Sequence, residues 1–185
     1  MRQKLGLRDE LVVGHVGRFN PQKNHLFLLD IFAVLLKKEP NAALLLVGGG
    51  EDMPKIQAKA QTLGIEEHVR FLGIRSDVAD LMQAMDVFVF PSLYEGLPVT
   101  MVEAQAAGLA CLISDKVPPE CILTDDLVDI LPLLADPETW AEKILEKRNS
   151  PRTDRQSEIA ARGFDITTEA VKLQEFYINA YEQNC

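Results

Sequence analysis

The segment VFVFPSLYEGLPVTMVEA, residues 87–104, decides the fold that the sequence predicts. It joins a short apolar run, a turn rich in Pro and Gly, and a stretch of small apolar residues, which together predict a buried strand, a loop and a helix. The free N–H groups at the start of such a helix point towards the place where the strand ends. Glu95 and Glu103 fall close to this place. The segment therefore predicts a ligand site at the end of the strand.

Glu103 is the unusual residue of this segment. Its neighbours Met101, Val102 and Ala104 predict a helix that packs against a sheet. An unpaired carboxylate on such a face costs several kcal/mol. We therefore expect a polar group to contact Glu103.

Strand-like and helix-like segments alternate along the chain. Apolar runs with the length of strands occur at 11–16, 42–47, 69–72, 87–90, 110–113 and 127–131. Helices are predicted at 24–39, 52–63, 78–85 and 99–107. Asn24 is the expected N-cap of the first helix, and Gly64 and Gly108 are the expected left-handed C-caps.

Almost every position of these strands is apolar, and helices join them. This pattern predicts a parallel sheet that is covered on both faces. The predicted fold class is therefore α/β, a single domain with an open, doubly wound (Rossmann-like) parallel sheet. Ligands of such sheets lie beyond the carboxyl ends of the strands.

Two further helices are predicted in the C-terminal part. Asp136 followed by Pro137 indicates an N-cap and a first helical turn, so that a helix runs to about Lys147. The sequence at 150–153 predicts a break. A last helix at 165–182 has an apolar stripe that requires a partner surface, formed by Ile166, Ala170, Leu173, Phe176, Tyr177 and Ala180.

The composition excludes several classes of protein. The chain has 185 residues, 47% of them hydrophobic and 25% charged, as in an ordinary globular domain. Its net charge of −9 argues against a nucleic-acid surface, which needs a basic face. The chain lacks an apolar run of roughly 20 residues and a start that resembles a signal peptide, which favours a cytoplasmic location.

Cysteines, histidines and carboxylates do not form a metal site in the sequence. Cys111, Cys121 and Cys185 have no Cys-x-x-Cys spacing, and we expect them to be reduced and structural. His15 is expected in the core, and His25 and His68 are expected at the surface, none with a catalytic role. An Asp-x-Asp motif is absent, so a metal cofactor is not expected.

Two loops at predicted strand ends have residues that suit a phosphate ligand. After the first strand, Arg18 can bridge phosphate oxygens and Lys23 can act as a point charge. After the second strand, the glycines at 48–50 let backbone approach a ligand closely. Neither loop has the Gly-x-Gly-x-x-Gly or P-loop pattern. Two solvated cations and a flexible turn remain the alternative interpretations.

Taken in order, these motifs resemble the C-terminal donor domain of retaining GT-B glycosyltransferases of group 1 (family 4 type). The subgroup that the sequence is most similar to builds bacterial exopolysaccharides and capsules. The resemblance runs from about residue 5 to residue 181. It rests on Gly17-Arg18-Phe19 with Gln22-Lys23-Asn24, on Val47-Gly48-Gly49-Gly50, on Phe71-Leu72-Gly73, and on Glu95-Gly96-Leu97-Pro98 with Glu103-Ala104.

The resemblance implies catalytic roles for Arg18, Lys23 and Glu95. Arg18 and Lys23 match cations that bind the diphosphate and stabilise the leaving nucleotide without a metal. Glu95 matches a glutamate that meets the donor sugar, and Glu103 matches one that accepts hydrogen bonds from the ribose. Retention of anomeric configuration is also implied by the resemblance alone.

The remaining matches place backbone near the ligand. Gly17, Gly48 and Gly49 fall in the phosphate and sugar loops of the family. Ile74 and Arg75 lie where the family's backbone contacts the base. Gly96, Leu97 and Val99 fall where amides approach the sugar or diphosphate.

The resemblance also implies a second domain. Family members have an N-terminal acceptor domain, and this chain starts where the linker to the donor domain lies in the family. We therefore expect residues 1–185 to be an isolated donor domain that does not transfer sugar alone, with a helix from about residue 165 that crosses back to the missing domain. A full-length enzyme is expected in the cytoplasm, with the option of peripheral association with the inner face of the membrane.

Two other functions remain open. A sugar-nucleotide epimerase uses similar diphosphate loops, but it requires a base close to the sugar. A non-enzymatic nucleotide-binding module requires no acceptor half. The leading hypothesis is transfer of a hexosyl group from a nucleoside diphosphate sugar, with UDP as the first choice, to a saccharide or lipid-linked acceptor. The base, the sugar and the acceptor do not follow from the sequence.

Overall fold

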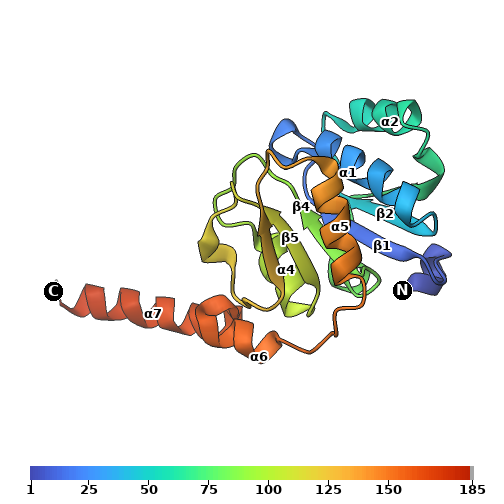
Figure 1. The fold of residues 1–185 in the computed structure, drawn as a ribbon. Helices are drawn as coiled ribbons and strands as arrows, with labels where there is room; N and C mark the ends of the chain where they lie inside the picture. Colours follow the sequence, from blue (N-terminus) through green and yellow to red (C-terminus); the bar gives the residue numbers. More distant parts are fainter. Residues whose placement is uncertain (184–185) are drawn as a thin grey trace.

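Six parallel strands form the centre of the molecule, in the order β3-β2-β1-β4-β5-β6 (Figure 1). The computed structural model describes residues 1–183, and Cys185 lies outside the described residues. The strands are β1 (Leu11–Val16), β2 (Ala42–Val47), β3 (Val69–Gly73), β4 (Val87–Phe90), β5 (Ala110–Ser114) and β6 (Val128–Leu131). Every pairing is parallel. The predicted doubly wound α/β sheet is confirmed, with strand ends close to those expected.

Helices alternate with these strands along the chain. They are α1 (His25–Lys38), α2 (Met53–Thr62), α3 (Val78–Met82), α4 (Val99–Ala106), α5 (Pro137–Lys147), α6 (Gln156–Ile159) and α7 (Ile166–Glu182). A short 3-10 turn, η2 (Pro21–Lys23), precedes α1, and a π-helical turn, η5 (Ala160–Phe164), follows α6. The sequence did not predict α6 or η5.

Helix α3 is shorter than predicted. The sequence predicts a helix to residue 85, but α3 ends at Met82 and the chain continues in tight turns. The guanidinium of Arg152, which comes from the predicted break at 150–153, donates hydrogen bonds to the carbonyl oxygens of Met82 and Met85. A distant part of the chain therefore satisfies the carbonyl groups at the end of this helix.

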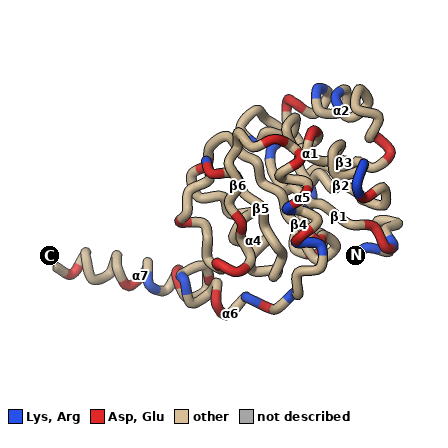
Figure 2. The backbone as a smooth tube through the Cα atoms, in the orientation of Figure 1, with Lys and Arg blue, Asp and Glu red and all other residues tan. Residues whose placement is uncertain are grey.

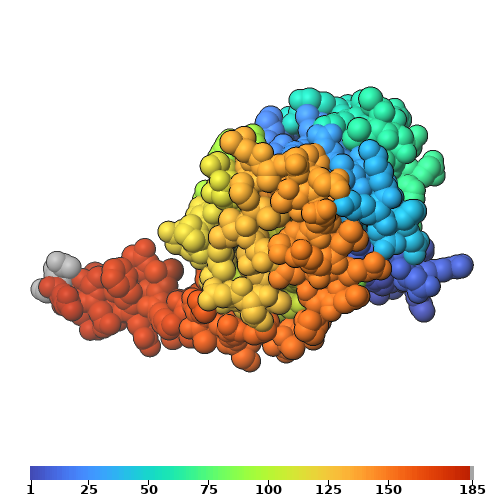
Figure 3. All heavy atoms as spheres, viewed as in Figure 1, coloured from blue at the N-terminus to red at the C-terminus, as the bar shows by residue number. Residues whose placement is uncertain are grey.

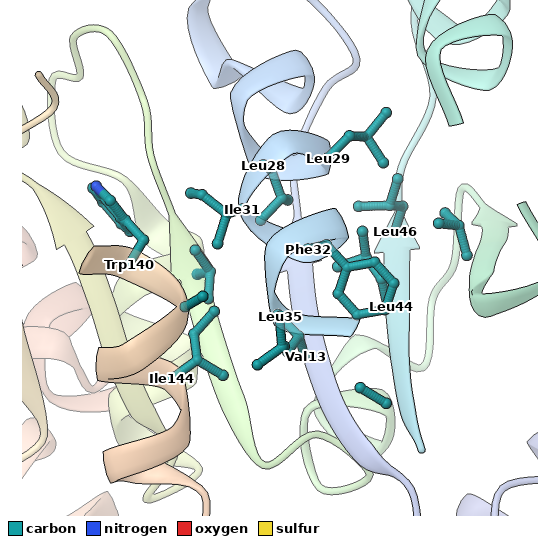
Figure 4. Packing of buried hydrophobic residues seen from close by; sticks show 14 of the residues in the cluster. Val13, Leu28, Leu29, Ile31, Phe32, Leu35, Leu44, Leu46, Trp140 and Ile144 are labelled. Carbon is teal, nitrogen blue, oxygen red and sulfur yellow. The ribbon is translucent and has the colours of Figure 1, made fainter. Parts of the chain in front are cut away.

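Both faces of the sheet are covered, and each face has its own core. On one face, the side chains of α1 pack against strands β1 and β2. They also pack against Trp140 and Ile144 of α5 (Figure 4). On the other face, Met82 of α3 and Met101 of α4 pack against alternate residues of the same strands. Fully burying one such side chain contributes about 1.5–3 kcal/mol. These two cores fix the sheet and therefore the position of its carboxyl edge.

The predicted helix caps are confirmed with one exception. Gly64 and Gly108 adopt left-handed backbone, with φ of 67° and 65°. Asp136 accepts a hydrogen bond from the Thr139 amide over 2.9 Å and caps α5 as predicted. Asn24 was expected to cap α1, but its side chain makes no such bond and donates instead to the carbonyl oxygen of Pro91. The Asn24 amide is therefore used to join two loops.

Helix α7 extends away from the body of the domain as an arm (Figures 1 and 3). It contains no buried residue. Its exposed apolar side chains include Ile166, Leu173, Phe176 and Tyr177. The predicted apolar stripe is therefore present, and within residues 1–183 the body of the domain does not cover it.

Charged residues lie on the helices, on the loops and on the two edge strands β3 and β6, which contain Arg70 and Asp129. Strands β1, β2, β4 and β5 contain none. Acidic and basic positions are interspersed along the backbone and do not separate into a basic face (Figure 2). Among the helices of residues 1–183, none combines the length and the apolar character that a membrane-spanning segment requires.

Candidate functional site

The candidate site lies where the order of the sheet reverses. Strands β1 and β4 are neighbours in space, and the chain leaves them towards opposite sides of the sheet. In doubly wound folds the loops that follow two such strands form a crevice in which ligands bind. Here these loops contain Gly17–Asn24 and Pro91–Glu95. The topology therefore brings together the two loops that the sequence had singled out.

Lys23 and Glu95 meet in this crevice. The Lys23 Nζ lies 2.7 Å from the Glu95 Oε1, and the side chains are only 14% and 6% exposed. The same ammonium lies 4.6 Å from the centre of the Phe90 ring, at the end of β4. A cation over an aromatic face and beside a carboxylate is held in place by both. Two of the residues predicted to be catalytic thus form one nearly buried ion pair.

Gln22 belongs to the same cluster, although the sequence gave no reason to assign it a role. Its side-chain amide donates to the carbonyl oxygen of Tyr94 over 2.9 Å and to the Glu95 Oε2 over 3.2 Å. The Leu93 amide donates to the carbonyl oxygen of Gln22 over 2.8 Å. Turn η2 and the loop after β4 are therefore joined by several hydrogen bonds.

Arg18 lies at the open side of the crevice. Its guanidinium is 3.2 Å from the Glu51 carboxylate, and its side chain is 70% exposed. An exposed pair of this kind contributes about 0–1 kcal/mol. Arg18 can therefore leave Glu51 for a phosphate at little cost.

The glycine loop after β2 packs against the loop after β1. Gly48 has a φ of +133°, and a Cβ on it would lie 2.0 Å from the carbonyl oxygen of Gly17. A Cβ on Gly50 would lie 2.3 Å from the carbonyl oxygen of Phe19. The flexible-turn alternative is thus disfavoured, since these glycines allow two backbones to approach. The contact of Gly17, Gly48 and Gly49 with a ligand stays a prediction.

Ile74 and Arg75 follow β3 on the same edge of the sheet. Ile74 is 88% exposed. The Arg75 guanidinium is held by both carboxylate oxygens of Asp77, at 2.8 and 2.7 Å. The Arg75 charge is therefore already paired, and the contact of Ile74 and Arg75 with a base stays a prediction.

Glu103 lies on α4, and its environment differs from that expected. Its side chain is exposed, so the expected position against the sheet is wrong: the apolar neighbours pack inwards while Glu103 faces the solvent side of α4. It lines two neighbouring pockets of about 500 and 360 Å³, which it shares with Gln156 of α6. No hydrogen bond to its carboxylate occurs within residues 1–183. Partial burial raises the pKa of the Glu103 carboxyl above its usual value.

The start of α4 faces the same region. Leu97 and Val99 are exposed, and α4 has no side-chain N-cap. The first backbone amides of a helix have no intrahelical acceptor, and they favour negative charge. The loop from Gly96 to Val99 therefore offers free amides next to Glu95. The structure gives no hydrogen bond between this loop and the Lys23 ammonium.

Two histidines lie beneath the ion pair. His25 was expected at the surface, but it is fully buried, because its ring turns inwards to contact Phe19 at 4.5 Å and His15 at 4.6 Å between ring centres. Burial lowers the pKa of His25 to about 2, and burial lowers the pKa of His15 to about 4. The His15 Nδ1 lies 2.9 Å from the carbonyl oxygen of Val89, so that nitrogen is the protonated one. Both rings are neutral near pH 7.

The side chains that could bind a metal or form a disulfide are not arranged to do so in the described part of the chain. Within residues 1–183, no group of three or more His, Cys, Asp or Glu side chains is arranged to hold a metal ion. Cys111 and Cys121 are buried and unpaired, as expected.

Comparison with known proteins identifies the family of this chain. A family model described as "Glycosyl transferases group 1" matches residues 1–163. The chain therefore belongs to the group 1 glycosyltransferase family. It is 38% identical over 172 residues to EpsF of Bacillus subtilis (strain 168), a protein named as a glycosyltransferase. The matched region is 91% of this chain and 45% of EpsF.

A second relative is the Escherichia coli enzyme UDP-Gal:alpha-D-GlcNAc-diphosphoundecaprenol alpha-1,3-galactosyltransferase. The two chains are 30% identical over 183 residues, which is 95% of this chain and 47% of the enzyme. The chain thus spans about half the length of these relatives.

Solved structures show the same fold. Sucrose-phosphate synthase from Thermosynechococcus elongatus superposes with a TM-score of 0.84 at 25% identity, over 98% of this chain and 48% of that one. Anabaena Alr3699/HepE, solved in complex with UDP-glucose, superposes with a TM-score of 0.79 at 25% identity, over 96% of this chain and 51% of that one.

Proposed function

We propose that this chain binds a nucleoside diphosphate sugar as the donor half of a retaining glycosyltransferase. The observation that carries the proposal is the Lys23–Glu95 pair at the point where the sheet order reverses. A cation and a carboxylate held side by side suit a ligand that has a diphosphate next to sugar hydroxyls. Two similar proteins support UDP as the nucleotide, because the name of the Escherichia coli relative contains UDP-Gal and Anabaena Alr3699/HepE was solved in complex with UDP-glucose.

The cations are proposed to stabilise the leaving group. A nucleoside diphosphate gains negative charge as the glycosidic bond breaks, and charges placed in advance favour this transition state over the ground state. Lys23 is fixed by its partners, and Arg18 is free to move onto the outer phosphate oxygens. The free amides at the start of α4 add to this field. These residues need no metal ion for this role, and we propose that binding is independent of metal.

The carboxylates are proposed to bind hydroxyl groups. Glu95 lies inside the crevice, where it suits the donor sugar. Glu103 has a carboxylate without a hydrogen-bond partner within residues 1–183 and lines two pockets, which suits the ribose. The exposed backbone at Ile74 and Arg75 suits the base. The base would then lie between the loop after β3 and the start of α4.

The acceptor is proposed to be held by another domain. Transfer requires an acceptor in near-attack geometry and exclusion of water from the leaving group. The open crevice offers neither by itself, and we expect this chain alone to bind donor without transferring sugar. The apolar stripe of α7 is proposed to contact that domain. A role in bacterial exopolysaccharide synthesis and a place at the inner face of the membrane are parts of the same proposal.

The observations do not favour the alternative functions. An epimerase requires a base at the sugar, but His15 and His25 are buried beneath the crevice. A binding module without catalysis has no particular need for a carboxylate in the sugar position.

A thermal-shift panel tests the proposed function. UDP-, GDP- and ADP-sugars are added to the chain in the presence of EDTA, and the melting temperature is measured. A ligand at 100 times its dissociation constant adds about 2.7 kcal/mol to the free energy of unfolding. We expect a rise in melting temperature with a UDP-sugar that EDTA does not reduce. If no nucleotide sugar raises it, the proposed function is wrong, and if EDTA abolishes the rise, only the metal-free part is wrong.

Replacing Glu103 by Gln tests the ribose contact. The substitution keeps the shape of the side chain and removes the charge, so we expect affinity for UDP to fall by about 1–3 kcal/mol. The melting temperature without ligand should stay unchanged, because Glu103 is exposed. Calorimetry with UDP and with 2′,3′-dideoxy-UDP measures the effect. Loss of the same size for both ligands would contradict the ribose assignment.

A further inference from the structure

Each carboxylate oxygen of Glu95 has its own hydrogen-bond donor. Lys23 binds Oε1 over 2.7 Å, and the Gln22 amide binds Oε2 over 3.2 Å. A carboxylate has about four lone-pair positions, so each oxygen keeps room for one more donor. The two contacts therefore fix the plane of the carboxylate and leave it able to accept hydroxyl groups.

The Gln22 amide is itself fixed. One of its N–H groups is directed to the carbonyl oxygen of Tyr94 and the other to Glu95. The backbone carbonyl oxygen of Gln22 accepts from the Leu93 backbone amide, and the side-chain amide of Asn24, in the same turn, donates to the carbonyl oxygen of Pro91 over 3.1 Å. Rotation of the Gln22 side chain would break both of its hydrogen bonds. Gln22 thus connects the Glu95 carboxylate to turn η2 and to the backbone of the loop after β4.

Lys23 alone cannot orient Glu95 in the same way. A single ammonium contact lets a carboxylate turn about the contact, whereas two contacts give geometric specificity. In addition, a bound diphosphate attracts the Lys23 ammonium. Gln22 holds the other oxygen of the Glu95 carboxylate independently of this attraction.

We propose that Gln22 is a positioning residue that orients the Glu95 carboxylate towards the donor sugar and so determines how much the sugar adds to donor binding. The inference rests on the proposed function. It assigns to Gln22 an effect on the sugar, because its side chain donates to Glu95. It assigns no effect on the nucleotide, because within residues 1–183 the Gln22 side chain makes no hydrogen bond to Arg18, Lys23 or Glu103.

The test is the variant Gln22→Met, which keeps the length of the side chain and removes both donated hydrogen bonds. The matched control is Gln61→Met, at an exposed position of α2. Dissociation constants for UDP and for the preferred UDP-sugar are measured by calorimetry. We expect affinity for UDP to stay within twofold of wild type and affinity for the UDP-sugar to fall about tenfold, equal to about 1.4 kcal/mol. A purely structural role of Gln22 would weaken the binding of UDP and of the UDP-sugar equally, and that result overturns the inference.

A crystal structure of Gln22→Met without ligand gives a second readout that does not depend on the donor. We expect the Glu95 carboxylate to rotate while Lys23 keeps its contact with Oε1. An unchanged Glu95 would overturn the inference even if wild type bound a UDP-sugar. If wild type binds no nucleotide sugar, the proposed function fails in the calorimetric arm, and the crystal structure still decides whether Gln22 orients Glu95. Should Gln22→Met not fold, Gln22→Leu, which also removes both donated hydrogen bonds without adding charge, replaces it in the same two assays with the same expectations.

Discussion

Replacing Lys23 by Met is expected to reduce the preference of the chain for UDP over uridine and to lower the free energy of unfolding. The Glu95 carboxylate is 6% exposed and would lose the cation that compensates its burial. Removing one partner of a buried ion pair costs about 3–5 kcal/mol, most of it from the uncompensated charge. Urea denaturation followed by circular dichroism measures the stability, and calorimetry with UDP and uridine measures the preference.

Two further variants serve as controls for Lys23→Met. Arg18→Met should weaken the binding of UDP more than the binding of uridine. It should leave the free energy of unfolding unchanged, since Arg18 is exposed. The double variant Lys23→Met with Glu95→Gln should regain most of the stability, because the buried charge is then removed as well. A Lys23→Met protein that unfolds within about 1 kcal/mol of wild type would contradict the buried-pair interpretation. Equal losses for UDP and uridine would contradict the phosphate assignment.

Lowering the pH from 7 to 5 is expected to destabilise the chain through His15 and His25. Burial lowers the pKa of these rings to about 4 and about 2, from 6.5 in the unfolded chain. Between the folded and unfolded pKa values the unfolded state binds more protons, so stability is lost as the pH falls. Each histidine then accounts for a loss of about 2 kcal/mol between pH 7 and pH 5. Urea titrations at the two pH values measure the total.

The variant His25→Phe isolates one of the two histidines. A phenyl ring suits the contacts of His25 with Phe19 and His15 and cannot be protonated. We expect the variant to lose about 2 kcal/mol less than wild type between pH 7 and pH 5. The same pH dependence in both proteins would show that His25 is not buried in the neutral form.

The sheet was predictable because its signal is local. Strands β1, β2, β4 and β5 contain no charged residue, and helices α2 and α4 are followed by Gly64 and Gly108, whose left-handed backbone the sequence predicted. Segments α6 and η5 were missed since α6 is four residues long and its position depends on contacts with α4. Arg152 binds carbonyl oxygens at the end of α3 from a distant part of the chain, which no local pattern indicates.

The candidate site was predictable only in part. Lys23 and Glu95 were selected from separate loops, and the parallel topology with β1 beside β4 explains why they meet. The burial of His25 was missed because a polar residue at the start of a helix gives no sign of which way its ring turns. Gln22 was missed because its role depends on two hydrogen bonds across loops that are far apart in the sequence.

The most direct test of donor binding is a map of backbone amide chemical shifts during titration of the isotope-labelled chain with UDP in EDTA. The account predicts saturable shifts at Gly17, Gly49, Ile74 and Gly96, four loops on one edge of the sheet. It also predicts no shifts on α2 or α5, the helices that pack with α1 over one face of the sheet. Absence of shifts at millimolar UDP, or shifts confined to a surface away from the Lys23–Glu95 pair, would contradict the account.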